Sequence, residues 1–359
     1  MQSTEDRRAC QPREGYPLEC EVVGGLEDLA CEDVRRVLGD RASVASVGRG
    51  LFWLRLHGDL GTALALRLVT AVSLIESFPV PRPRALLGDQ HIRALRGAID
   101  LVRGLHPPGA FASFRLAGAG SDSAVFARLA EAIADHTGLP SDPDEADLLI
   151  RIRPAAAFPD GWEAVVRLTP RPLSARAWRV RNYPGALHAP VAAAVVELTR
   201  PHPSDRFLNA LCGSGTLLIE RLLRMSAALA VGCDTNGASL AAAEQNLRAA
   251  GLAGKATLLD ADATALPWAD ASFDVLCADL PWGQLVGSHE DNRHLYPALL
   301  AELTRLAAPG ARLALVTQQP RLLEDVLAAE ASQWRPVDTL HLAHASTYPR
   351  IYLLQRWPG

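Results

Sequence analysis

An acidic residue followed by an apolar turn and a tryptophan forms the part of this chain best suited to chemistry. The stretch DLPWG, residues 279–283, directly follows the apolar run FDVLCA. The Asp279 carboxylate and a neighbouring backbone carbonyl can hold both hydrogens of an exocyclic amine on a nucleobase, a poor nucleophile whose lone pair is delocalised into the ring. Pro281 fixes the turn, and Trp282 offers a flat face on which an extruded base can stack. The alternative is a buried tryptophan beneath an aspartate that caps the turn.

A glycine-rich turn between an apolar run and a helical stretch is the second candidate. In FLNALCGSGTLLIE, residues 207–220, Gly213 and Gly215 let the backbone turn without a Cβ atom. A helix that begins near Thr216 directs its first amides at whatever lies above the strand. The later apolar runs ALAVGC, ATLLDA and FDVLCA are each followed by polar strand-end residues. Four such strand ends define the ligand side of an open doubly wound α/β sheet.

The polar residues at these strand ends suggest how an adenosyl cofactor would be held. Asp234 can accept from both ribose hydroxyls, with helix capping as the alternative. Asp262 and Ala263 can receive the adenine edge, with turn capping as the alternative. Asn209 can accept from a methionyl ammonium through its amide oxygen. The predicted cofactor-binding residues are Asn209, Cys212, Gly213, Ser214, Gly215, Thr216, Asp234, Asp262 and Ala263.

The cysteines show no pattern of a metal or disulfide site. There are six of them, without a C-x-x-C pair, and several lie in strand-like runs. We expect reduced core thiols, no bound metal and a cytoplasmic protein. Cys277 precedes Asp279 on the same strand but is not part of a Cys-Pro dipeptide, so a core position is favoured over a nucleophile.

Positive charge is concentrated in one segment although the net charge of the chain is −4. Residues 164–196 contain five arginines and no acid. A local basic surface of this kind suits contact with phosphates, whereas the alternative is a solvated loop rich in arginine because Lys255 is the sole lysine. The candidate RNA-binding residues are Arg151, Arg153, Arg171, Arg176, Arg179 and Arg181.

Length and hydrophobic pattern predict several domains. A chain of 359 residues is too long for one core, and it has neither a membrane-length apolar run nor an N-terminal secretory pattern. Residues 1–80 alternate strand, helix, strand, strand, helix and strand, with the second helix expected over 60–72, which is a ferredoxin-like order. A second α/β unit is expected over 81–170, a basic connector over 171–188, and a Rossmann-like domain over 189–359.

The last domain is expected to end in an antiparallel hairpin formed by VDTLHLA and RIYLLQRW, because the gap between these runs is short. This ending is typical of methyltransferases. A dehydrogenase remains open, although its usual third glycine is here Leu218.

The motifs NALCGSGTLLIE, GCDTN, DADAT, DLPWG and NRHLYPALLAELTRL resemble the THUMP-domain family of class I tRNA guanine-N2 methyltransferases. The connector RVRNYPGALHAPVAAAVVEL and the two N-terminal α/β units also resemble this family, so the resemblance covers nearly the whole chain. It implies S-adenosylmethionine as donor, a THUMP domain over 81–170 that grips the 3′ CCA end of tRNA, and Asp279 and Trp282 at the target guanine.

The same resemblance implies methylation at position 6 of the acceptor stem, with position 10 as the alternative. Other readings left open are methylation of an amino group on ribosomal RNA or of adenine in DNA, and a non-catalytic RNA-binding protein. We expect a monomer without membrane attachment, and the alternative is an enzyme that needs an activating partner protein.

Overall fold

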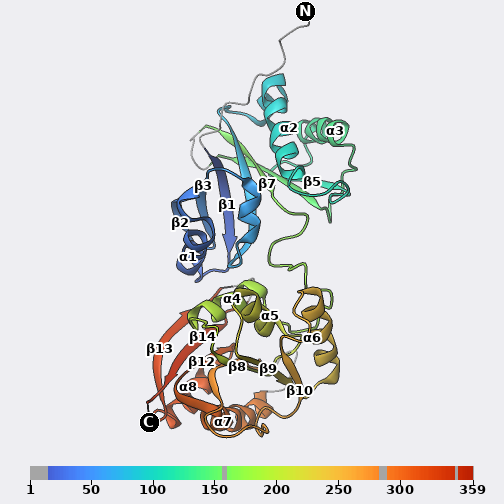
Figure 1. The fold of residues 1–359 in the computed structure, drawn as a ribbon. Coiled ribbons are helices and arrows are strands. Elements are labelled where there is room, and N and C mark those ends of the chain that lie inside the picture. Colours follow the sequence, from blue (N-terminus) through green and yellow to red (C-terminus); the bar gives the residue numbers. More distant parts are fainter. Residues whose placement is uncertain (1–14, 156–159, 283–288, 344–346, 359) are drawn as a thin grey trace, which may run out of the picture. The chain divides into compact units, whose positions relative to one another are not determined.

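The chain forms two compact units. The computed structural model describes residues 15–155, 160–282, 289–343 and 347–358 (Figure 1). One unit, here called the N-terminal unit, comprises residues up to Val22 and Ala30–Leu173, and the other, the C-terminal unit, comprises Val23–Leu29 and Ser174–Gly359. Each unit contains its own seven-stranded sheet. The two are described separately below.

The first four strands of the N-terminal unit have the expected ferredoxin-like order. They are β1 (Tyr16–Val22), β2 (Ala42–Gly48), β3 (Leu51–Leu56) and β4 (Val69–Phe78), with α1 (Glu27–Leu38) after β1. The strands lie in the order β2-β3-β1-β4, and β1 pairs antiparallel with both β3 and β4. In β1, Leu18 and Cys20 are fully buried on one face, and Glu19 between them is 1% exposed on the other, so both faces of the strand are covered there.

The prediction of a helix over residues 60–72 is wrong for most of this stretch. A 3₁₀ helix covers Leu60–Ala65, with the Asp59 side chain accepting from the Gly61 amide, and β4 begins at Val69. The run LGTALALRLVTAV is apolar almost throughout, so periodicity alone does not separate helix from buried strand. Pairing of β4 with β1 on one side and with β7 on the other decides for the strand.

The second half of the N-terminal unit extends the same sheet. It contains η3 (Pro83–Leu87), α2 (Asp89–Arg103), β5 (Phe114–Gly118), α3 (Ala124–Thr137), β6 (Leu148–Pro154) and β7 (Trp162–Arg167). Ser123 caps α3, and Gly138 ends it in the left-handed conformation, both as expected. Pairing of β7 with β4, from Ser73 opposite Arg167 to Phe78 opposite Trp162, joins both halves. Residues 1–80 and 81–170 therefore share one sheet.

The C-terminal unit alternates strands and helices as the sequence predicts. Its elements are α4 (Ala189–Leu198), β8 (Arg206–Ala210), α5 (Thr216–Arg224), β9 (Leu229–Asp234), α6 (Gly237–Ala249), β10 (Thr257–Asp260), β11 (Phe273–Asp279), α7 (His289–Leu306), β12 (Ala307–Thr317), α8 (Pro320–Ala329), β13 (Trp334–His341) and β14 (Arg350–Arg356). The strand order is β10-β9-β8-β11-β12-β14-β13. Strands β8 to β12 are parallel, and β14 is antiparallel to both of its neighbours, which confirms the predicted hairpin.

The order of strands places the ligand edge of this sheet. The chain runs outward from β8 to β10 and then returns to β11 on the other side of β8. In open α/β sheets, ligands bind beyond the carboxyl ends of the strands at such a reversal. The core beneath is apolar and includes Leu208, Val231, Leu276 and Leu313, all fully buried. The sheet thus presents the ends of β8 and β11 together over a rigid core.

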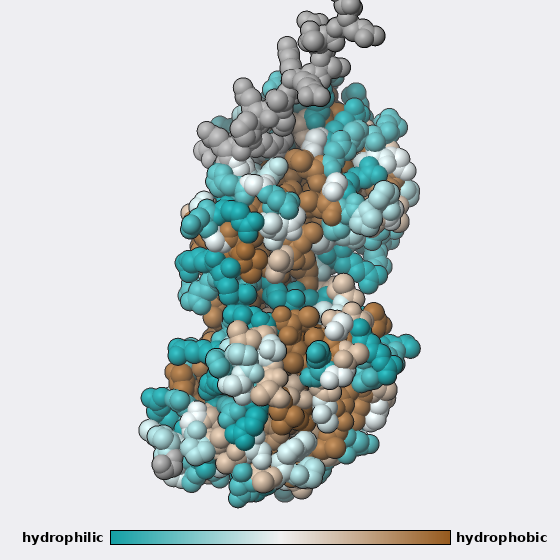
Figure 2. Space-filling view, in the orientation of Figure 1, coloured by the Kyte–Doolittle hydropathy of each residue, from teal (hydrophilic) through white to brown (hydrophobic). Residues whose placement is uncertain are grey.

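Cysteine placement and hydropathy agree with the sequence analysis where the structure describes them. Cys20, Cys31, Cys212, Cys233 and Cys277 are buried free thiols, whereas Cys10 lies outside the described residues. No helix in the described ranges is long and apolar enough to cross a bilayer. On the face of the molecule seen in Figure 2, hydrophilic and apolar residues are interspersed over both units.

Candidate active site

The turn between β8 and α5 has the conformation that its glycines allow. Leu211, Gly213 and Gly215 have φ angles of 55°, 52° and 83°, all in the left-handed region. A Cβ atom on Gly215 would also lie 3.1 Å from the Cβ of Ala243 on α6. Glycine at 215 therefore satisfies both the backbone angle and the close approach of α6. The turn brings the first amides of α5 to the carboxyl edge of the sheet.

Asp234 ties the end of β9 to this turn. Its Oδ2 accepts from the Gly213 amide at 2.9 Å, and its Oδ1 accepts from the Asn236 amide at 2.9 Å. Asn236, not Asp234, caps α6, because its side chain accepts from the Ala238 and Ser239 amides. Capping of α6 therefore does not explain an aspartate at 234. Each carboxylate oxygen retains acceptor capacity beyond its one backbone contact.

Asp262 caps the turn that follows β10, which was the alternative to a role in binding adenine. Its Oδ1 accepts from both the amide and the hydroxyl of Thr264 at 2.8 Å. The residue is exposed, and the neighbouring Ala263 is 2% exposed. Within the described part of the chain, no hydrogen bond or ion pair involves Asp262 Oδ2. One oxygen thus fixes the turn while the other is available to a ligand.

Asn209 and Ser214 carry buried polar atoms without partners. Asn209 is 1% exposed and donates from Nδ2 to the carbonyls of Ala210 at 3.2 Å and Cys277 at 3.4 Å. Its Oδ1 and the Ser214 hydroxyl are buried and have no hydrogen-bond partner among the described residues. A buried acceptor without a donor is costly. These atoms therefore favour a ligand that supplies polar groups at the end of β8.

Strand register explains why these residues meet. Asn209 lies opposite Gly232 of β9 on one side and Cys277 of β11 on the other, and Asp234 lies opposite Asp260 of β10. The predicted cofactor-binding residues thus line the carboxyl ends of adjacent parallel strands. Cys212, at the start of the turn, is a buried thiol whose pKa is raised well above its usual range by desolvation, which makes it a poor nucleophile.

Asp279 ends β11 with a carboxyl group that is mostly withdrawn from water. Its backbone lies opposite Val316 of β12, and its Oδ1 is buried without a hydrogen-bond partner in the described ranges. Burial raises the pKa of Asp279 to about 8, and the Trp282 indole opposes this rise. No hydrogen bond of normal geometry joins the two side chains, since Trp282 Nε1 is likewise buried and unpaired. Within the described residues, the site therefore holds one carboxylate oxygen and one indole N–H group that lack hydrogen-bond partners.

Helix α7 and strand β12 hold the turn that follows Asp279. The Pro281 carbonyl accepts from Asn292 Nδ2 at 2.7 Å and from the Tyr296 hydroxyl at 2.9 Å. The hydroxyls of Tyr296 and Thr317 are 3.0 Å apart. Asn292, Tyr296 and Thr317 are at most 1% exposed. We call Asn292, Tyr296, Thr317 and Gln319 the turn clamp, since Gln319 Nε2 donates to the Trp282 carbonyl at 3.0 Å.

The turn clamp is not among the site residues predicted from the sequence. The motif NRHLYPALLAELTRL contains Asn292 and Tyr296 at a spacing of four residues, which places both on one helix face. That spacing was the available signal. Because the Pro281 carbonyl already accepts two hydrogen bonds, another carbonyl of the turn must serve an incoming amine. Gly283 lies outside the described residues.

The six candidate RNA-binding arginines occupy different environments. Arg151 forms ion pairs with Glu19 at 3.5 Å and Glu21 at 2.5 Å, and Arg153 pairs with Glu19 and, at 2.7 Å, with Glu163. Both arginines lie on β6 of the N-terminal unit. Their charge is thus balanced within the sheet, which reduces what they offer to a phosphate.

The connector arginines differ from one another as well. Arg176 is buried and pairs with Glu220 at 2.8 Å, an arrangement typical of a structural ion pair. Arg179 donates to the Thr216 hydroxyl beside the glycine turn. Arg171 is exposed, and so is Arg181, whose Nε donates to the side-chain oxygen Oε1 of Gln245 at 2.7 Å. Two of the four connector arginines therefore face solvent.

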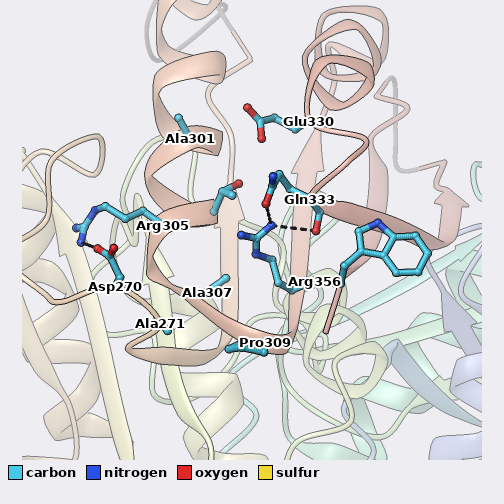
Figure 3. A pocket seen from close by; sticks show the side chains of 11 residues that line it. Asp270, Ala271, Ala301, Arg305, Ala307, Pro309, Glu330, Gln333 and Arg356 are labelled. Atoms are coloured by element: carbon cyan, nitrogen blue, oxygen red, sulfur yellow. Dashed lines mark hydrogen bonds and ion pairs between the residues drawn. The ribbon is translucent and has the colours of Figure 1, made fainter. Parts of the chain in front are cut away.

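A cavity of about 540 Å³ lies at the opposite end of the sheet (Figure 3). It is lined by residues such as Asp270, Ala307 and Arg356, which adjoin the amino ends of β11 and β12 and the last residue of β14. Arg356 donates to the Gln333 side chain, and Arg305 pairs with Asp270 at 2.8 Å. The cavity contains none of the predicted site residues, so we do not connect it with Asp279.

A family model and curated relatives match the chain. Residues 176–347 match the model of the RMKL-like methyltransferase domain. The chain is similar to the tRNA (guanine(6)-N2)-methyltransferase of Thermus thermophilus, with 28% identity over 94% of this chain and 99% of that protein. It is also similar to the bovine tRNA (guanine(6)-N(2))-methyltransferase THUMP3, with 29% identity over 49% of this chain. That match spans only 37% of the bovine protein's length.

Solved structures show the same architecture over nearly the whole chain. The crystal structure of TrmN from Thermus thermophilus has a TM-score of 0.70 and 26% identity, and the similarity covers 95% of this chain and 99% of that one. A predicted N6-adenine-specific DNA methylase from Listeria monocytogenes has a TM-score of 0.66 at 19% identity, which shows likeness of fold alone. The fold expected from the sequence is thereby confirmed for both units.

Proposed function

We propose, on the premise that this chain belongs to the THUMP-domain class I tRNA guanine-N2 methyltransferase family, that it methylates the exocyclic N2 amine of a guanosine in tRNA. The observation that carries the proposal is the buried Oδ1 atom of Asp279 at the end of β11, which has no hydrogen-bond partner among the described residues. Strand β11 pairs with β8, the strand that precedes the glycine turn. The relatives from Thermus thermophilus and cattle named above are, by their names, tRNA guanine-6 methyltransferases, and position 6 is accordingly the proposed target.

S-adenosylmethionine fits the residues at the carboxyl ends of β8 to β10. The left-handed Gly213 and Gly215 leave the turn without Cβ atoms, and Asp234 retains lone pairs for two ribose hydroxyls. The Asp262 Oδ2 atom can accept from the adenine amine above the buried Ala263. Asn209 Oδ1, which is buried and has no donor in the part of the chain that the structure describes, can accept from the ammonium group. When bound, this donor supplies an activated methyl group.

Asp279 can activate an exocyclic amine, which is a poor nucleophile. An ionised Asp279 and the neighbouring Leu280 carbonyl can accept from the two N2 hydrogens of guanine and orient the nitrogen lone pair. As the new carbon–nitrogen bond forms, N2 becomes positive, and the carboxylate stabilises that charge in a site of low polarity. Because burial raises the pKa of Asp279 to about 8, this carboxylate is also a stronger base than an ordinary aspartate and can take the released proton.

Trp282 and the turn clamp determine where the base lies. The Trp282 ring can stack on an extruded guanine, which is worth about 1–3 kcal/mol for such contacts. Gln319 donates a hydrogen bond to the backbone carbonyl of Trp282, and Asn292 and Tyr296 donate to the backbone carbonyl of Pro281. The clamp thus keeps carboxylate, carbonyl and ring in one arrangement before substrate arrives.

Contacts to tRNA are proposed for both units. Arg171 and Arg181 are exposed and suit phosphates directly. Arg151 and Arg153 would contact RNA only in competition with their glutamate partners. We propose that residues 81–170 act as the THUMP domain that grips the 3′ end, in keeping with the family.

Inosine substitution tests the proposed reaction directly. Inosine differs from guanosine by lacking the N2 amine, so a tRNA transcript with inosine at position 6 should accept no methyl group, whereas the guanosine transcript should yield N2-methylguanosine in nucleoside mass spectrometry. A transcript with inosine at position 10 is the matched control and should be methylated normally. Equal methylation of both position-6 transcripts would reject N2 at this position, and failure of every tRNA transcript would reject the substrate class.

A further inference from the structure

Arg179 lies against the first residue of helix α5. Its Nη2 donates to the Thr216 hydroxyl at 2.9 Å and to the Leu187 carbonyl at 2.9 Å. Thr216 is the first residue of α5 and follows Gly215 of the glycine turn. The guanidinium therefore adjoins the free amides at the positive end of a helix, where an anion is favoured.

No acid in the described ranges neutralises Arg179. The nearby Glu220 forms its ion pair with Arg176, at 2.8 Å. Arg179 Nε is buried and has no hydrogen-bond partner among the described residues. Desolvation lowers the pKa of Arg179, Glu220 acts in the opposite direction, and Arg176 lowers it further. A partly buried cation without a counter-ion is unfavourable, so this position suits an anionic ligand group.

Unpaired polar atoms lie on the same turn. The Ser214 hydroxyl belongs to a residue that is 2% exposed, and it has no partner in the described part of the chain. Asn209 Oδ1, on the preceding strand, is a buried acceptor that likewise has no partner among the described residues. A cation and a hydroxyl near an acceptor together complement an α-amino acid group, whose carboxylate needs donors and whose ammonium needs an acceptor. An RNA phosphate would satisfy the cation but not the buried acceptor.

We infer that Arg179 binds the carboxylate of the donor's amino-acid part, and this inference rests on the function proposed above. Arg179 is one of the arginines that the sequence suggests for RNA binding. Its contact with Thr216, and an Nε without a partner among the described residues, favour the donor site instead. The sulfonium and ammonium groups make the amino-acid part of S-adenosylmethionine positive. The Arg179 guanidinium therefore repels a donor that lacks the carboxylate. Arg179 thus also selects for donors that keep the carboxylate.

Calorimetry with two nucleosides tests the assignment. S-adenosylmethionine and its decarboxylated form differ only in the carboxylate. In Arg179→Gln, affinity for S-adenosylmethionine should fall about tenfold to a hundredfold, the loss expected for a hydrogen bond to a charged group. Affinity for the decarboxylated form should stay equal or rise, since a repulsive charge is removed. Arg181→Gln, a change in the same connector, is the control and should alter neither affinity. Arg179→Lys should recover part of the loss.

The outcomes separate this inference from the proposed function. Equal loss for both nucleosides in Arg179→Gln would mean that Arg179 only supports the fold, and no loss for either would remove it from the site. In both cases the wild-type protein still binds its donor, and the proposed function is untouched. Wild-type protein that binds neither nucleoside would overturn the function and the inference together.

Discussion

Replacing Asp279 by asparagine should stabilise the unliganded protein at alkaline pH. The carboxyl group is buried and its Oδ1 has no partner among the described residues, so the ionised form is destabilised. An amide of nearly the same shape removes the charge and leaves the packing intact. The same change should nearly abolish methylation, because the amide does not balance positive charge on the target nitrogen.

The pKa shift of Asp279 fixes the sign and the upper limit of the stability effect. The pKa rises from 3.8 to about 8 on folding, so the folded protein binds this proton more tightly than the unfolded chain does. The stabilising contribution of the neutral carboxyl is complete below pH 3.8 and is lost as the pH rises to 8. Over the about 3 pH units between pH 5 and pH 8, the free energy of unfolding of the wild type should fall by about 4 kcal/mol at most. Water penetration around the carboxylate reduces this loss to about 2–3 kcal/mol.

Urea unfolding of wild type and Asp279→Asn at pH 5 and pH 8.5 measures this effect. The free energy of unfolding of the wild type should fall relative to the variant as the pH rises. Asp260→Asn, at an exposed carboxyl on β10, is the control and should run parallel to the wild type. Parallel profiles for Asp279→Asn would refute the buried-carboxyl reasoning. Single-turnover methylation by the wild type should rise over the same pH range, since the ionised form reacts.

Further changes test the rest of the site. Asp234→Ala should weaken S-adenosylmethionine binding about tenfold or more, because two ribose hydroxyls lose a charged acceptor, and unchanged affinity in calorimetry would remove Asp234 from the site. Tyr296→Phe should slow single-turnover methylation about tenfold with donor affinity unchanged, because the Pro281 carbonyl loses one of two donors. A wild-type rate would contradict the clamp. Trp282→Ala should lose most activity and Trp282→Phe should keep much of it, whereas equal losses would argue against stacking. Replacing Arg171 and Arg181 together should flatten the salt dependence of tRNA binding by about one log–log unit per phosphate contact, and an unchanged slope would assign them structural roles.

The C-terminal unit was largely predictable because its signals are local. Each parallel strand there is a short apolar run followed by a turn, and the glycines of the β8–α5 turn occupy positions that other residues fill poorly. Asp234 and Asp279 could be placed at strand ends from the pattern alone. The antiparallel hairpin followed from two β-rich runs with a short gap.

What the sequence did not predict depends on contacts between distant residues. The stretch 60–72 has enough leucine and alanine to suggest a helix, but pairing of β4 on both edges overrides that propensity. The clamp requires that α7 deliver Asn292 and Tyr296 to the carbonyl of Pro281, which no local pattern specifies. The ion pair between Arg176 and Glu220 likewise cannot be predicted from the positions of the arginines in the sequence.

Because β4 pairs with β7, residues 1–80 and 81–170 should be inherited together as one structural unit. A gene fragment that ended at residue 80 would leave the edge of β4 that pairs with β7 open. One that began at residue 81 would expose the edge of β7, whose Ala164, Val165 and Val166 are fully or almost fully buried. Open apolar edges of this kind invite aggregation. Recombination at the apparent boundary would therefore be selected against, and we expect both halves to be duplicated, transferred or lost as one.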